Sequence, residues 1–384
     1  MKKFVVCSLA FLLCQFAAFA AAPDTVVLRI QSYIKEGNLT AADQALSAAL
    51  KDFPVDGGLY NLRGIINANR QNLKAAEVDF ARAVELSPRF ASAYRNLVRV
   101  CEMRSASDPD ALNRARRALE QLAPLEPKDP APLMELARIA EKQQDLKGAL
   151  SYLAHARDLK PDYAPVHFFF GIVCIELNLP LEAKKSLQKA VDLDPDNAPY
   201  NYARGAVELQ GASGWLAIPY FKKFVAARPN DPRGHFALGV AEFTGHDYEA
   251  SAKQMNLIAA NKETMAGAEY YLGRIAKAES DWEAAAGHFE KSIAADANYA
   301  ESHAELGLAK MHLKDLAGAR KEIDRALALN PDSYIANGNL LALFQRTRDP
   351  LVKTQEQKMR ELDLKRSKEQ ELMVRTIQVR QYAD

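Results

Sequence analysis

Apolar positions along this chain follow a helical period that stops and restarts every 34 residues. Within residues 164–197, a first apolar series surrounds Gly171, and a turn containing Asn and Pro follows it. A second series, Ala183, Leu187 and Ala190, falls at i, i+4 and i+7 before an Asp-Pro pair ends it. Because these spacings place apolar side chains on one helix face, the pattern predicts two amphipathic helices joined by a short turn.

Small residues repeat with the same period and in a fixed phase. Where helices cross within about 8–10 Å, Gly or Ala lets the backbones approach while larger neighbours fill the remaining space. A unit copied at this period stacks on its neighbours to bury its apolar face. The glycines are Gly171, Gly205, Gly239, Gly273 and Gly307, and the alanines of the second helices are Ala149, Ala183, Ala217, Ala285 and Ala319.

One predicted helix departs from the amphipathic pattern. Residues 164–177, APVHFFFGIVCIEL, are apolar all round the helix. A helix of this kind that lines a surface would expose some of its apolar side chains. Because exposed apolar patches mark interaction sites, the segment favours a binding role for this part of the chain.

Residues at fixed places in both helices mark a known family. First helices carry Leu-Gly pairs. A second helix carries Ala, an aromatic residue, Ala and then Pro. These residues have the spacing of the tetratricopeptide repeat family, so the chain resembles that family. The resemblance implies an all-α fold, a right-handed superhelical solenoid of antiparallel helix-turn-helix repeats. The residues that carry it are Leu238-Gly239, Leu272-Gly273, Leu306-Gly307, Ala76, Phe80, Ala83 and Pro88.

The repeat phase divides the chain along most of its length. We expect one solenoid domain over residues 21–349, followed by a capping helix and tail over 350–384, because the last apolar face of a solenoid needs a cover. The expected repeats are 23–56, 57–90, 91–129, 130–163, 164–197, 198–231, 232–265, 266–299 and 300–333, with an extra helix at 334–346.

The first 20 residues have the basic, apolar and small-residue regions of a secretory signal peptide. We expect cleavage after Ala20 and export to the periplasm or the outside of the cell, with an uncleaved anchor as the open alternative. A lipid anchor on Cys14 is not expected, because Leu13 stands where lipoprotein signals have a small residue. No other stretch reaches the ~20 apolar residues that span a bilayer.

Composition and motifs argue against several classes of function. A net charge of +1 over 384 residues argues against nucleic acid as a general partner. His167, His235 and His303 share one repeat position, which favours a structural role. The chain has no His-Glu-x-x-His motif, nucleophile elbow or P-loop. We therefore expect no enzymatic activity, no metal site and no cofactor.

The resemblance places ligand contacts on the first helices, which line the concave surface in that family. Aromatic residues recur there at steps of 34, and apolar or basic residues accompany them. Such a wall would bury anchors from a partner peptide or helix. The alternative is that the aromatic residues pack on adjacent helices. The expected groove residues are Phe168, Tyr202, Phe236, Tyr270, Ile172, Ile175, Leu209, Phe243, Arg274 and Lys277.

Basic residues replace the apolar ones at the corresponding positions of the third and fourth repeats. These are Arg95, Arg99, Arg138 and Lys142, which we name the basic rim. Such a rim could receive an acidic segment or a terminal carboxylate through charge-assisted hydrogen bonds. The alternative is a set of solvated side chains without a partner.

The sequence as a whole predicts a non-enzymatic scaffold that binds protein segments in its groove and assists assembly of a bacterial-type envelope complex. Two alternatives stay open. One is an accessory or tethering subunit of an envelope enzyme that processes glycans or other polymers. The other is a self-assembling structural solenoid, and homo-oligomerisation is compatible with all three.

Overall fold

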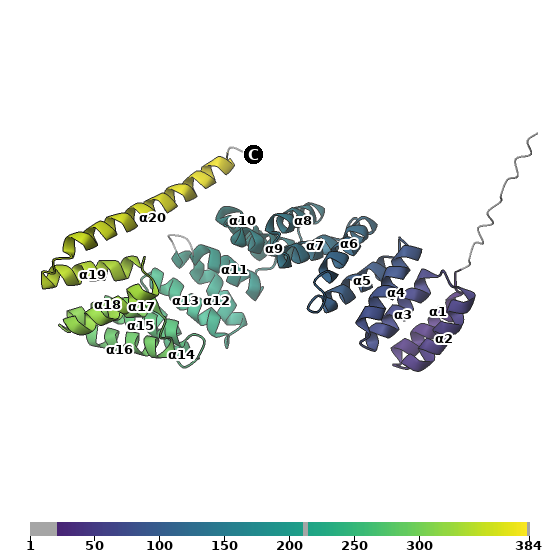
Figure 1. Ribbon diagram of the computed structural model, residues 1–384, viewed down its shortest axis with the longest axis horizontal. Coiled ribbons are helices and arrows are strands. Elements are labelled where there is room, and N and C mark those ends of the chain that lie inside the picture. Colours follow the sequence, from purple (N-terminus) through teal and green to yellow (C-terminus); the bar gives the residue numbers. More distant parts are fainter. Residues whose placement is uncertain (1–20, 210–213, 382–384) are drawn as a thin grey trace, which may run out of the picture. The chain divides into compact units, whose positions relative to one another are not determined.

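The computed structural model describes residues 21–209 and 214–381, with side chains up to residue 367. All regular structure within these ranges is helical (Figure 1), which confirms the predicted all-α repeat fold. The helices form two compact units that divide between Asn178 and Leu179. The predicted leader, including Cys14, lies outside the described residues.

Unit 1 consists of helices that pack against their neighbours in the chain. Its hairpins are α1 with α2, α3 with α4, α5 with α6, and α7 with α8, and α9 packs on α8. The bounds are α1 Asp24–Lys35, α2 Leu39–Asp52, α3 Gly57–Asn69, α4 Leu73–Leu86, α5 Ala91–Arg104, α6 Ala111–Leu122, the 3-10 turn η1 Ala123–Leu125, α7 Ala131–Lys142, α8 Leu146–Leu159 and α9 Ala164–Glu176.

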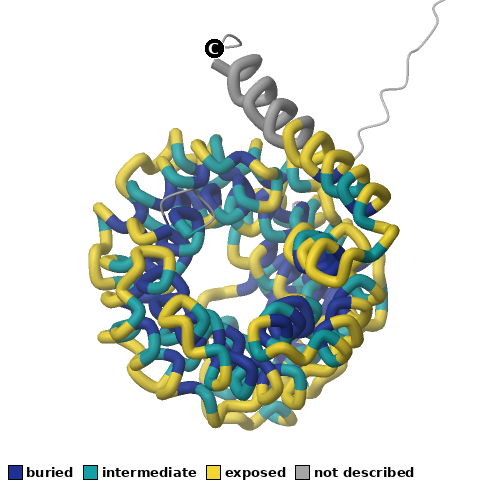
Figure 2. The backbone as a smooth tube through the Cα atoms, turned by 90° about the vertical axis from the view of Figure 1, so that its left-hand side faces the viewer, coloured by how far each residue is buried: buried dark blue, intermediate teal, exposed yellow. Residues whose placement is uncertain are grey.

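Unit 2 repeats the hairpin arrangement and ends in a long helix. Figure 2 shows buried and exposed residues mixed along the described helical backbone, as amphipathic helices require. The bounds are α10 Pro180–Leu193, α11 Ala198–Leu209, the 3-10 turn η2 Gly214–Ala217, α12 Ile218–Ala227, α13 Pro232–Thr244, α14 Tyr248–Ile258, α15 Met265–Ala278, α16 Trp282–Ala295, α17 Ala300–His312, α18 Leu316–Leu329, α19 Tyr334–Thr347 and α20 Val352–Gln381.

The turns inside several hairpins share one backbone geometry. At Ser280, between α15 and α16, the chain adopts a left-handed conformation with φ 64°. The next residue, Asp281, caps α16 by accepting a hydrogen bond from the Ala284 amide at 2.9 Å. A left-handed residue that ends one helix and a short acidic cap that begins the next fix the reversal of the chain. The same pair of features occurs at Gln144 with Asp145, His246 with Asp247, and Lys314 with Asp315.

Four of the five phased glycines, Gly205, Gly239, Gly273 and Gly307, lie where the two helices of a hairpin cross. A Cβ added to Gly273 would lie 2.6 Å from the ring of Phe289, and one added to Gly205 would lie 2.8 Å from the ring of Phe221. These distances are shorter than real carbon contacts, so glycine is sterically required there. Gly64, Gly239 and Gly307 lie in equally close crossings with the residue 16 positions later.

The phased histidines have structural partners. A ring nitrogen of His167 lies 2.7 Å from the carbonyl oxygen of Pro161, and Asn201 donates to the Pro195 carbonyl at 2.9 Å. Each bond ties a first helix to the turn six residues before it, which satisfies a carbonyl that the turn leaves open. His235, His303 and Asn337 make the same contact, which confirms the structural interpretation of the three histidines.

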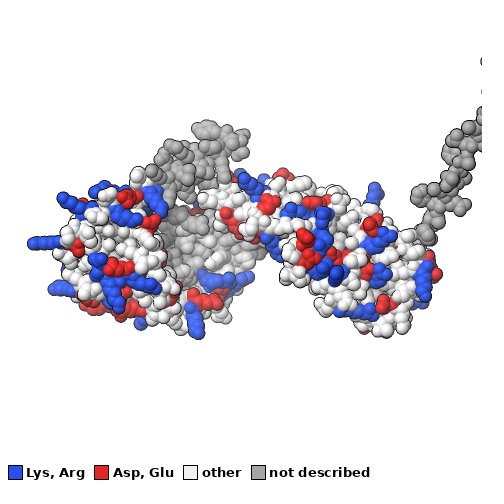
Figure 3. Space-filling view, in the orientation of Figure 1, with Lys and Arg blue, Asp and Glu red and all other residues white. Residues whose placement is uncertain are grey.

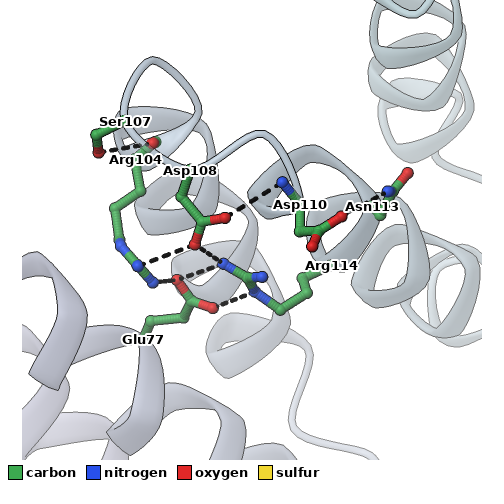
Figure 4. Close-up of polar contacts among 7 residues, drawn as sticks. All are labelled: Glu77, Arg104, Ser107, Asp108, Asp110, Asn113 and Arg114. Atoms are coloured by element: carbon green, nitrogen blue, oxygen red, sulfur yellow. Dashed lines mark hydrogen bonds and ion pairs between the residues drawn. The ribbon is translucent and has the colours of Figure 1, made fainter.

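An ion cluster fixes the longer turn of the third repeat (Figure 4). Glu77 of α4 bonds to both Arg104 of α5 and Arg114 of α6. Asp108 in the turn accepts from Arg104 at 3.0 Å and from Arg114 at 2.6 Å. Since Glu77 is 8% exposed, its charge is compensated by two guanidinium groups rather than by water.

Helix α20 packs on the end of unit 2. Gln355 donates to both the backbone carbonyl and the side-chain oxygen of Asn337 at 3.0 Å, and Leu362 is buried. Lys358 and Lys365 both bond to Asp332, which holds the pKa of that carboxyl well below its usual range, at about 2. These contacts join α20 to α19 and to the turn before it.

Candidate peptide-binding surface

Two adjoining hollows lie over α5, α7 and α9 of unit 1. The larger one, which we name the α7–α9 cavity, has a volume of about 260 Å³, and residues of both α7 and α9 line it. The smaller one, of about 150 Å³, lies over α5 and the start of α7. Both are lined by Ala131 and Glu135, so they form neighbouring parts of one surface.

The wall of the α7–α9 cavity is mainly apolar. Met134 of α7 and Phe169 of α9 contribute large side chains, and Tyr163 contributes a ring from the turn before α9. Phe169 is 45% exposed, and its ring meets that of Phe168 edge-on at 5.3 Å. The exposure of this ring agrees with the expectation that a helix with apolar residues on all sides leaves part of its apolar surface in water.

Carboxyl groups stand at the same cavity. Glu135 and Glu141 line it, six residues or about one and two-thirds helical turns apart on α7, together with Arg138. Arg138 is bonded to Glu102 of α5, so its charge is already compensated. Desolvation by the surrounding walls and the charge of Glu102 raise the pKa of Glu135, although Arg138, Arg95 and Arg99 act in the opposite direction.

Acids within unit 1 engage half of the predicted basic rim. Arg95 bonds to Glu126 at 2.6 Å and to Asp129 at 3.2 Å, and Arg138 is held by Glu102. Arg99 and Lys142 are exposed, and neither forms an ion pair within the described part of the chain. Figure 3 shows acidic and basic side chains interleaved on the visible face of each unit. The rim is therefore weaker as an anion site than its arginine content suggests.

The aromatic residues predicted to line the groove in unit 2 contact rings of neighbouring helices. Tyr202 meets the rings of Phe221 and Phe224 on α12 at 5.7 and 4.9 Å. Phe236 meets Tyr271 of α15 at 5.9 Å. Tyr270 is 6% exposed, because the neighbouring rings of α15, α16 and the turn before α17 enclose it, which agrees with the alternative that the aromatic residues pack on adjacent helices. Burial also raises the pKa of its hydroxyl well above its usual range.

The remaining predicted residues divide between the units. Ile172 and Ile175 are half-buried on α9, and Leu209 packs on two core clusters of unit 2. The Arg274 guanidinium stacks 4.4 Å from the centre of the Phe243 ring and 5.5 Å from those of Tyr270 and Tyr271. Lys277 bonds to both oxygens of Glu305 at 2.7 Å. The basic part of this wall is thus occupied by aromatic and acidic neighbours within unit 2.

Sequence comparison assigns the repeats to a family. One tetratricopeptide repeat profile matches residues 140–207, and another matches residues 27–94, 216–266 and 270–334. Together they cover more than half of the chain. The protein belongs to the tetratricopeptide repeat family. Proteins of this family are generally protein-interaction scaffolds, and their fold is typically non-enzymatic.

Three solved structures that are similar to this chain match 53–83% of its length. The Cut9–Hcn1 hetero-tetramer of the APC/C is 14% identical, with 83% of each chain covered and a TM-score of 0.46. Pseudomonas aeruginosa PilF is 17% identical, with 53% of this chain and 90% of that chain covered and a TM-score of 0.42. YrrB, described as having an unusual peptide-binding site, is 20% identical over 58% of this chain and 97% of its own, with a TM-score of 0.36. No curated protein matches the chain.

Within the described ranges, His, Cys, Asp and Glu side chains form no group of three that could hold a metal ion. None of the helices described there combines the length and the hydrophobicity that a membrane span requires.

Sequence reasoning missed four residues of the α7–α9 cavity: Phe169, Met134, Glu135 and Glu141. The family positions drew attention to Phe168, its neighbour in sequence. A signal for Phe169 was present, since the segment 164–177 is too apolar to bury all its faces. The sequence held no comparable signal for the other three, because their exposure depends on how α7 and α9 meet in this tetratricopeptide repeat array.

Proposed function

We propose that this tetratricopeptide repeat protein is a non-enzymatic scaffold that binds an extended or helical segment of a partner protein in the α7–α9 cavity of unit 1. The family's general role in protein interaction supports this proposal. With the predicted leader peptide, we propose further that the scaffold works outside the cytoplasm and assists assembly of an envelope complex.

The exposed Phe169 side chain beside an open cavity is the observation that carries the proposal. Exposed aromatic residues in contact with a pocket are the type of residue that contributes most binding energy in protein interfaces. The cavity is somewhat smaller than the roughly 300–1,000 Å³ of small-molecule sites, which suits a side chain or two of a peptide. The more buried aromatic residues of unit 2 offer less surface for this purpose.

Selection of peptides tests the site without knowledge of the natural partner. A random library of displayed 12-residue peptides would be selected on the immobilised protein, and individual binders would then be titrated against variants. Phe169→Ala should weaken the selected peptides at least tenfold, since anchors of this kind contribute more than about 1.4 kcal/mol. Leu28→Ala is the matched control, because Leu28 is a 62% exposed residue of the same unit on α1.

The outcome separates the two kinds of surface. Equal affinity for Phe169→Ala and the unchanged protein, at equal thermal stability, would remove the α7–α9 cavity as the site. Peptides that respond instead to a unit 2 variant such as Phe236→Ala would return the proposal to the aromatic wall predicted from the family.

The cellular location has a test of its own. Fractionation and N-terminal sequencing of the mature protein should give a chain that begins at Ala21 in the periplasmic or secreted fraction. A chain that keeps Met1 and stays in the cytoplasm would contradict the envelope part of the proposal and leave the binding part intact.

A further inference from the structure

We propose that the α7–α9 cavity binds a lysine or arginine side chain of the partner segment, with the aliphatic stem on Met134 and Phe169 and the cationic head at Glu135 and Glu141. The inference rests on the proposed function and specifies the chemistry of its ligand. It also reverses the charge of the partner that the basic rim suggested.

The apolar part of the cavity matches the stem of a long basic side chain. Lysine and arginine carry three or four methylene groups that pack on apolar surfaces while the charged end stays in a polar environment. Met134, Phe169 and the buried Leu153 and Val173 supply such a surface. The open ring of Phe169 could in addition stack on a cation.

The polar part of the cavity carries uncompensated negative charge. Glu135 and Glu141 accept no hydrogen bond and form no ion pair through their side chains within the described part of the chain. Arg138, the cation among the lining residues, is neutralised by Glu102. The lining together with Glu102 therefore has a net charge of about −2, and a ligand cation would reduce it.

Charged groups near the cavity also favour a negative electrostatic potential there. Desolvation together with the charge of Glu141 raises the pKa of Glu176 on α9, so Glu141 interacts unfavourably with a further carboxylate. The nearby Lys160 is engaged, since its ammonium lies 4.7 Å from the centre of the Tyr163 ring. Arg99 lines the smaller hollow and carries one positive charge that opposes these acids.

The shifted acids provide a pH signature. The pKa of Glu135 is raised by desolvation and by Glu102 against the opposing effect of Arg138, Arg95 and Arg99. A bound cation favours the ionised carboxylate and takes up its negative charge. Affinity should therefore be full at neutral pH and should fall as the pH is lowered through the raised pKa of Glu135.

A methyl resonance in the cavity reports binding directly. The protein would be labelled with [13C-methyl]methionine, and the Met134 signal would be assigned with Met134→Leu. The probe is the peptide acetyl-Ser-Ala-Lys-Ala-Ser-amide, together with versions that carry arginine, norleucine or glutamate at the central position. We expect the lysine and arginine peptides to shift the Met134 resonance, norleucine to bind several-fold more weakly, and glutamate to leave it unchanged.

Charge variants separate this inference from a general apolar site. Glu135→Gln combined with Glu141→Gln should weaken the lysine peptide about tenfold and leave the norleucine peptide unchanged. Glu120→Gln, an exposed acid on α6, should change neither. Equal binding of lysine and norleucine peptides, or an unaffected double variant, would overturn the inference.

The library selection keeps the two proposals distinguishable. Selected peptides that depend on Phe169 but lack a basic residue would contradict the inference and leave the peptide-binding function in place. If neither the selected peptides nor the lysine peptide binds at Phe169, both the proposed peptide-binding function and the inference about a basic side chain are contradicted.

Discussion

Equivalent positions in the two units have opposite environments. Phe168-Phe169 of unit 1 and Tyr270-Tyr271 of unit 2 are three repeat lengths apart in sequence. Phe169 is 45% exposed, whereas the ring of Tyr271 is surrounded by those of Phe236, Phe243 and Tyr270 at 5.3–5.9 Å. Repeat position alone therefore does not decide whether an aromatic residue is available to a partner.

The difference follows from two residues on the preceding first helix. Met134 and Glu141 occupy in unit 1 the repeat positions of Phe236 and Phe243 in unit 2. In unit 2 the two phenylalanine rings pack on Tyr271. In unit 1 a flexible thioether and a carboxylate stand there, and the α7–α9 cavity remains. Smaller and polar side chains at two phased positions thus convert a packed site into an open one.

The largest expected effect is the contrast between the equivalent rings. Tyr271→Ala should lower the free energy of unfolding by about 3 kcal/mol, the lower end for aromatic truncations, because Tyr271 is only partly buried. Phe169→Ala should change it by less than about 0.5 kcal/mol. Urea denaturation followed by circular dichroism measures both. Equal losses for the two variants would mean that the rings have the same environment.

The crossing that supports the packed site gives the next effect. Gly273→Ala on α15 should cost about 1–3 kcal/mol, because the new methyl would overlap the ring of Phe289. Gly287→Ala on α16 is the matched control, since nothing lies within 4 Å of its added Cβ, and it should gain up to about 1 kcal/mol. Melting temperatures that move in the same direction would contradict the steric account.

Filling the cavity tests whether the two substituted residues create it. Met134→Phe combined with Glu141→Phe should make unit 1 resemble unit 2 at these positions. We expect library-selected peptides to lose at least tenfold in affinity while the protein stays folded. Undiminished peptide binding by the filled variant would show that the peptides bind outside the α7–α9 cavity. Circular dichroism provides the control for folding.

The smallest effect compares acids in closed and open surroundings. Glu242 of α13 is 3% exposed, its Oε2 has no hydrogen-bond partner, and burial raises its pKa. Because the folded-state pKa is raised, its stabilising contribution is present at acid pH and lost as the pH rises. Glu242→Gln should therefore stabilise the protein increasingly between pH 4 and pH 8.

The exposed Glu135 is the control for this pH dependence. Its pKa is also raised, but water reaches the side chain, so Glu135→Gln should stabilise the protein less than Glu242→Gln does at pH 8. A larger gain from Glu135→Gln would show that the closed and open surroundings have been assigned the wrong way round.

The sequence predicted the features that depend on local chemistry. The 34-residue period predicted the positions of the hairpins. Helix α9 ends at Glu176 and α10 begins at Pro180, so the turn lies at the Asn-Pro segment where the sequence predicts it. Gly273 was read as a close crossing, which Phe289 confirms. These features follow from helix periodicity and side-chain volume within one repeat, which a single sequence displays directly.

Exposure could not be predicted in the same way. Tyr270 and Phe168 have the same repeat position, yet the burial of Tyr270 depends on its neighbour Tyr271 and on rings from two other elements, α16 and the turn before α17. The ion pairs of Arg95 and Arg138 join residues about one repeat apart, at 31 and 36 positions. Such pairings depend on how helices of adjacent repeats face each other, which the family pattern does not specify.

Site-specific photo-crosslinking tests the central claim most directly. Benzoylphenylalanine would be placed at Phe169, or at Leu28 as the exposed control on α1, and the protein would be irradiated in cells that produce it. We predict a discrete crosslinked partner from position 169 in the envelope fraction and none from position 28. The same product from both positions, or no product from position 169, would contradict the assignment of the α7–α9 cavity as the partner site.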